Sequence, residues 1–75
     1  MYENVKGLSK LSTDLQDKFQ RIHKRHLSAM GTAMRKKYIA ENLKEVKWVP
    51  KERCFHVFWK GNTDWFHYTL DGTWY

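Results

Sequence analysis

A dense run of aromatic residues near the C-terminus most constrains what this 75-residue chain can fold into. Nine of its twelve Phe, Trp and Tyr residues lie between Trp48 and Tyr75. A chain this short can assemble a core of only marginal size, and aromatic side chains bury more area per ordered residue than aliphatic ones do. We therefore expect a single domain over residues 1–75 whose core comes largely from this segment, with residues 1–9 as a partly ordered, flexible arm.

Alternating side chains predict strands within the aromatic segment. Phe55, Val57 and Trp59 share one parity, and the same spacing recurs after residue 64. Asp71-Gly72 is a strong hairpin signal, and Pro50 ends an earlier run because proline lacks the donor that a sheet needs. The segment predicts an antiparallel meander of three to four strands, namely residues 46–49, 54–59, 65–70 and 73–75.

The second face of these strands is more aromatic than contact with water alone would select. It carries the residues of the opposite parity, which are Cys54, His56, Phe58, Lys60, Trp65, His67 and Thr69. Four different groups could cover this face, and the sequence does not choose among them. They are a nucleic-acid base, a partner protein, a second copy of the chain in a homodimer, and the N-terminal segment of the chain itself.

Two helices are expected before the strands. Thr13 begins a capping box, and the helix after it continues to about Met30 with an apolar stripe on one side and basic residues on the other. Gly31 would end this helix, and Thr32 would cap a second one that runs to about Lys44. The alternative is one long bent helix, since glycine is tolerated inside helices. The expected fold is α+β, with these helices packed on the meander.

Positive charge is concentrated in one block of the chain. The net charge is +6, and residues 18–37 hold seven Lys and Arg residues and no Asp or Glu. A block of this length without acids is more typical of a contact surface than of a merely solvated helix face. We therefore expect a polyanionic or acidic partner.

The first hypothesis is a small basic protein that binds DNA or RNA through the phosphate backbone, with low sequence specificity. Cations displace counterions from phosphates, and exposed rings stack on unpaired bases. A variant makes the two helices a helix-turn-helix, although a third helix is missing. The candidate nucleic-acid-binding residues are Lys18, Arg21, Lys24, Arg25, Arg35, Lys36 and Lys37, with Lys60 and Trp65 as secondary contacts.

The second hypothesis is a small inhibitor or adaptor, of the type that phages and mobile elements encode, which docks on an acidic surface of a larger protein. Trp and Arg are typical anchors of protein interfaces. A basic helix suits an acidic protein groove as well as it suits a nucleic acid. Binding to nucleic acid at low salt separates the two hypotheses.

Other chemistries have weaker signals. Cys54, His56 and His67 could converge on one sheet face, but a single Cys in an aromatic strand lacks the paired ligand spacing of structural zinc sites. The acids are scattered, and no phosphate loop or nucleophile motif is present. We expect no metal, no cofactor and no enzymatic activity. Without paired Cys, a signal peptide or an apolar run of about 20 residues, we expect a cytoplasmic protein that does not enter a membrane.

Overall fold

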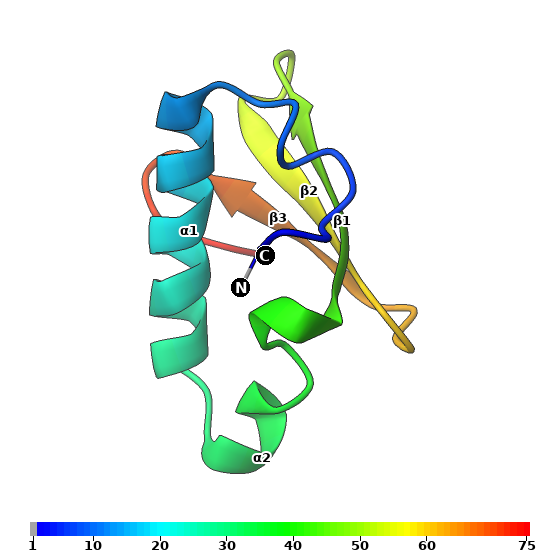
Figure 1. Ribbon diagram of the computed structural model, residues 1–75. Helices are drawn as coiled ribbons and strands as arrows, with labels where there is room; N and C mark the ends of the chain where they lie inside the picture. The colour runs from blue at the N-terminus through cyan, green and yellow to red at the C-terminus, as the bar shows by residue number, and fades with distance from the viewer. Residues whose placement is uncertain (1) are drawn as a thin grey trace.

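The computed structural model describes residues 2–75 and shows one main helix packed on one face of a three-stranded antiparallel sheet (Figure 1). The strands β1 (Leu43–Val49), β2 (Cys54–Trp59) and β3 (Trp65–Thr69) follow one another in the order β1-β2-β3. The predicted α+β class and the antiparallel sheet are confirmed. No helix in the described part of the chain is both long and apolar enough to span a bilayer.

The N-cap of helix α1 (Thr13–Ser28) lies one residue before the predicted cap, Thr13. The side chain of Ser12 accepts a hydrogen bond from the Leu15 amide at 3.2 Å, so Ser12 is the N-cap. The helix ends at Ser28, with Ala29 as its C-cap, close to the predicted end near Met30. Its buried residues recur at helical spacing and face the sheet; they are Phe19, Ile22, His23 and His26.

The predicted second helix is wrong, and so is the alternative of one long bent helix. Helix α2 is a single turn, Thr32–Arg35, and none of its residues is buried. Ile39 is already extended, and a 3₁₀ turn (η1, Ala40–Asn42) leads directly into β1. A continued helix would have to bury an apolar stripe, whereas here the chain unwinds so that Tyr38 and Ala40 enter the core.

The C-terminal residues pair back on β3 as expected, but they form a bridge and not a fourth strand. His67 and Tyr75 exchange two backbone hydrogen bonds of 2.8 and 3.0 Å, and Tyr68 bridges to Trp74. The described sheet therefore has three strands, which is the lower number of the predicted range.

The segment before α1 lies against the edge of β1. Lys6 donates to the Lys44 carbonyl at 3.3 Å and accepts from the Val46 amide at 2.9 Å. Gly7 has a φ of +87°, and a Cβ there would lie 2.4 Å from the Val46 carbonyl oxygen, so the close approach of the two backbones requires glycine. Val5 is buried beside it.

The core fills the space between α1 and the inner face of the sheet. Phe19 stands edge-on to Phe55 and stacks on Tyr68, with ring centroids 5.7 Å apart in both pairs. All three side chains are fully buried. The predicted dependence of the core on aromatic strand residues is therefore seen directly in these contacts.

Two histidines of α1 are part of this core. His23 donates its Nε2–H to the Tyr38 carbonyl at 2.7 Å, so its Nδ1 accepts from the Tyr2 hydroxyl at 2.8 Å. His26 Nδ1 is hydrogen-bonded to the Tyr68 hydroxyl at 2.7 Å. Burial lowers the pKa of His23 and lowers that of His26 to about 4, so both rings are neutral at pH 7.

Candidate functional site

The basic face of α1 borders a hollow beside the C-terminal turn. Lys18, Arg21 and Arg25 are exposed and line a hollow of about 280 Å³ together with the turn at residues 70–72. The spacing of three and then four residues places these three side chains on one side of the helix, over roughly 10 Å of its length. Three of the predicted cations therefore share one hollow.

The turn opposite these cations is held by its own side chains. Asp71 accepts hydrogen bonds from the Thr69 and Thr73 hydroxyls and, at 3.1 Å, from the Thr73 amide. The bond from Thr69 contributes most to lowering the pKa of Asp71, so its carboxylate is ionised and turned toward the threonines. Gly72 has a φ of +90°, and the Arg25 guanidinium lies directly over it.

The cations of this hollow have few acidic partners. Lys18 lies 3.0 Å from Asp14 in an exposed pair of the i, i+4 type. Among residues 2–75, the ion pairs of the structure engage no other Lys or Arg from the block 18–37. Exposed pairs of this kind are weak, so Lys18 can exchange Asp14 for an external anion.

The other cations of the block point elsewhere. Lys24 lines a separate, mostly apolar hollow with Ile39 and Glu41. Arg35 donates from Nε to the Leu27 carbonyl and from Nη2 to the Met30 carbonyl, each at 3.1 Å, and so closes the C-terminal end of α1. The exposed Lys36 and Lys37 follow α2, and their carbonyls accept from the side-chain amide of Asn42.

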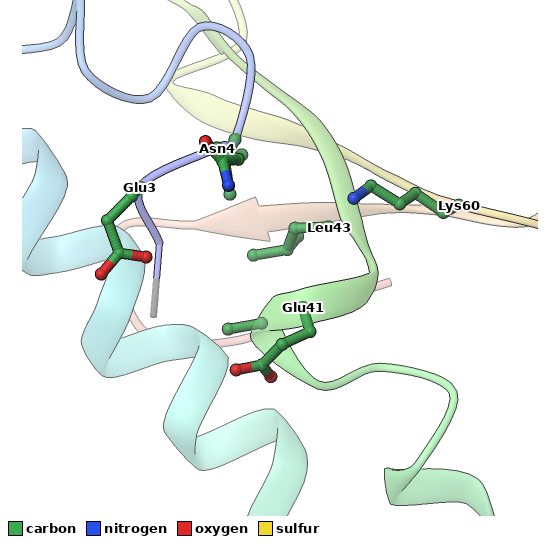
Figure 2. A pocket seen from close by; sticks show the side chains of 7 residues that line it. Glu3, Asn4, Glu41, Leu43 and Lys60 are labelled. Carbon is green, nitrogen blue, oxygen red and sulfur yellow. The ribbon is translucent and has the colours of Figure 1, made fainter.

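Lys60 lies apart from the basic face of α1. It lines a hollow of about 190 Å³ where the N-terminal segment meets η1 and β1. Figure 2 shows its side chain with those of Glu3 and Glu41 around this hollow. It also borders a second hollow with Lys37. The structure does not place Lys60 in the hollow that holds Arg21 and Arg25.

Trp65 lies on the face of the sheet opposite α1. It pairs across the strands with Phe58 and stacks on that ring at 5.4 Å, and it is 43% exposed. The inner face, by contrast, contacts α1 through Phe55 and Tyr68. The predicted set of site residues is therefore divided between the two sides of the molecule.

The outer sheet face also brings together two histidines and an acid. His56 and His67 are direct cross-strand partners, and their ring centroids are 4.8 Å apart. Glu52, in the turn between β1 and β2, places Oε1 at 2.7 Å from His56 Nε2 and at 3.9 Å from His67 Nε2. The alternation of residues predicted that the two histidines share one face, but it did not predict the part of Glu52. The available signal was that Glu52 lies four residues before His56, in the turn that precedes β2.

Cys54 belongs to the same face but is buried. Its Sγ lies 3.5 Å from Glu52 Oε1 and donates to it. Burial, with a smaller contribution from Glu52, raises the pKa of the Cys54 thiol, so it stays protonated at pH 7. A protonated, buried thiol is not a nucleophile.

Comparison of the chain with models of protein families, with curated proteins and with solved structures gives no match. The arrangement defines an α+β domain with a basic helix face on one side and an aromatic, histidine-bearing sheet face on the other. The function is therefore argued from these two surfaces.

Proposed function

We propose that this protein binds nucleic acid through the phosphate backbone, with Lys18, Arg21 and Arg25 of α1 as the central contacts. The observation that supports this most is that the three cations line one hollow and that Arg21 and Arg25 take part in no ion pair among the described residues. Lys24 is exposed but lines a different hollow, so it is not one of these central contacts.

The spacing of the cations suits a phosphate strand. The three side chains cover roughly 10 Å of helix, and one strand of duplex DNA carries about one charge per 3.4 Å of its axis. About three phosphates therefore fall within their reach. Phosphate contacts fix position without reading bases, so we expect low sequence specificity.

The Asp71 carboxylate favours a phosphate contact along α1 over entry of the nucleic acid into the hollow beside the C-terminal turn. It lines the same hollow and is ionised, so it repels an anion that approaches the C-terminal turn. A phosphate is then drawn to the helix side of the hollow, where the three cations lie. This arrangement orients the strand along α1.

The experiment is a salt titration of binding to labelled, mixed-sequence single- and double-stranded DNA and RNA by fluorescence anisotropy. With about three phosphate contacts, the logarithm of the binding constant should fall with the logarithm of the salt concentration at a slope of about −3 on duplex DNA. No detectable binding to any of the four at low salt contradicts the proposal.

A matched pair of double variants separates the site from net charge. R21Q/R25Q should reduce the slope by about 2 units and weaken binding roughly ten-fold or more at low salt. K44Q/K51Q removes the same charge from exposed positions on β1 and its following turn. An equal loss of affinity in both double variants would show that net charge alone attracts the nucleic acid, and this would contradict a binding site on α1.

Docking on an acidic protein surface is the second candidate function. Two large apolar side chains near the basic block are exposed, Met34 at 48% and Ile39 at 36%. Backbone binding to nucleic acid makes no use of such side chains, whereas protein interfaces do. M34S/I39S should leave nucleic-acid binding unchanged under the first proposal.

A further inference from the structure

We propose that the outer sheet face binds a Zn²⁺ ion through Glu52 Oε1, His56 Nε2 and His67 Nε2. One ligand atom from each of these three residues lies within 4.8 Å of the other two. The proposal does not depend on nucleic-acid binding, because α1 covers the other face of the sheet (Figure 1).

The distances fit a zinc site after small side-chain movements. Ligand atoms of a tetrahedral zinc with bonds of about 2.0–2.1 Å are roughly 3.3 Å apart. The carboxylate oxygen lies 2.7 Å from His56 Nε2 and 3.9 Å from His67 Nε2. A shift of under about 1 Å in the Glu52 side chain makes these two distances alike, and small rotations of the two histidine rings close the remaining separation, since all three ligand atoms already lie within 4.8 Å of one another.

Neighbouring rings hold the two histidines in place. Tyr75 stacks on His67 with centroids 4.3 Å apart and an angle of 6° between the planes. Trp65 lies 4.6 Å from the His67 ring and 4.9 Å from the His56 ring. Ligands held by packing lose less conformational entropy when a metal binds than freely rotating side chains do.

The thiol of Cys54 supports the carboxylate ligand. It donates to Glu52 Oε1 at 3.5 Å, from a fully buried position in β2. Groups of this kind orient metal-binding side chains without contacting the ion. Because the thiol is buried and donates to the carboxylate, Cys54 supports Glu52 and is not itself a ligand in this proposal.

The donor set favours zinc over other common divalent ions. Two imidazole nitrogens and one carboxylate oxygen suit Zn²⁺, whereas Mg²⁺ and Ca²⁺ require mostly oxygen ligands. The side chains are partly open to solvent, at 19% for His56, 23% for His67 and 50% for Glu52. A water molecule can therefore complete four-coordination.

The test adds Zn²⁺ alone to the full, untagged chain after removal of metal with a chelator. Isothermal titration should give one ion per chain, and the ring signals of His56 and His67 should shift in the NMR spectrum. The signals of His23 and His26 serve as internal controls, since both rings are buried and hydrogen-bonded in the core. They should not move.

Three single variants decide whether the site is the proposed one. E52Q and H67Q should each weaken Zn²⁺ binding at least about ten-fold, since the loss of even an outer-shell partner costs 10- to 100-fold. E45Q removes an equal charge from the same sheet face, at a position paired with Phe58, and should leave affinity unchanged. The NMR spectrum of each variant verifies folding.

Several outcomes would overturn the proposal. They are the absence of binding at millimolar Zn²⁺, affinity in E52Q equal to that of the unaltered chain, and shifts confined to His23 and His26. The second of these would reduce the site to an adventitious histidine pair.

Discussion

The two histidine pairs of this protein lie on opposite faces of one sheet and differ in how they are bonded. On the inner face, both rings are buried; His23 is hydrogen-bonded to Tyr2 and Tyr38, and His26 Nδ1 to Tyr68. On the outer face, His56 and His67 are partly exposed, and their Nε2 atoms turn toward one carboxylate.

This difference shows that the environment, and not the residue type, assigns the role of a histidine. Both ring nitrogens of His23 are hydrogen-bonded, so this ring has none left for a ligand, and burial disfavours its charged form. The outer pair retains contact with water and with Glu52. We therefore assign the inner pair to stability and the outer pair to ligand binding.

The largest expected effect is from removal of the central inner ring. F19A should cost about 4 kcal/mol, because it leaves a cavity among Phe55 and Tyr68. W65A, its counterpart on the outer face, should cost less than about 1 kcal/mol, since Trp65 is 43% exposed. Urea denaturation of both variants measures the contrast. A cost for W65A that matches F19A and depends on protein concentration would show that the outer face is covered in a dimer.

The next effect is a loss of stability in acid, caused by the inner pair. Burial, with a smaller contribution from His23, lowers the pKa of His26 to about 4, whereas the ring in the unfolded chain titrates near 6.5. Between these pH values the unfolded chain binds more protons, so stability should fall by about 2 kcal/mol as pH drops from about 6.5 to 4. Urea denaturation at several pH values measures this change. H56Q/H67Q should retain this loss of stability; its disappearance in that variant would contradict an origin in the inner pair.

The smallest expected effect is on two arginines, Arg35 at the end of α1 and Arg21 in the hollow. R35Q should cost about 0.5–1 kcal/mol, because two helix-terminal carbonyls lose their donor. R21Q should change stability by less than about 0.5 kcal/mol but should weaken nucleic-acid binding more than R35Q does. Thermal unfolding together with anisotropy measures both quantities. If R35Q weakened nucleic-acid binding more than R21Q, the interface would lie in the region of α2 and not in the hollow beside α1.

The strands and α1 could be predicted because their signals are local. Alternation around Val57, the break at Pro50 and the helical stripe through Phe19 each follow from a fixed period. The region after Gly31 could not be predicted, because tertiary contacts keep Tyr38 out of a helix. Its carbonyl accepts a hydrogen bond from His23, and its ring is buried in the core. The helix propensity of the local sequence does not predict that long-range contact.

The candidate site was predictable in part for the same reason. The basic face of α1 follows from helical spacing, which places Arg21 and Arg25 together. The division of the remaining cations does not, because it depends on side-chain bonds such as those of Arg35 to the end of α1. Glu52 was missed because a turn, with Arg53 at a φ of +53°, sets its direction.

The most direct test of the central claim, that the helix side of the molecule binds phosphates, is NMR mapping of the labelled chain with mixed-sequence duplex DNA at low salt. We predict shifts centred on Lys18, Arg21, Arg25 and the turn at Gly72, with the ring signals of His56 and His67 unchanged. The absence of shifts, or shifts confined to the outer face of β2 and β3, would contradict it.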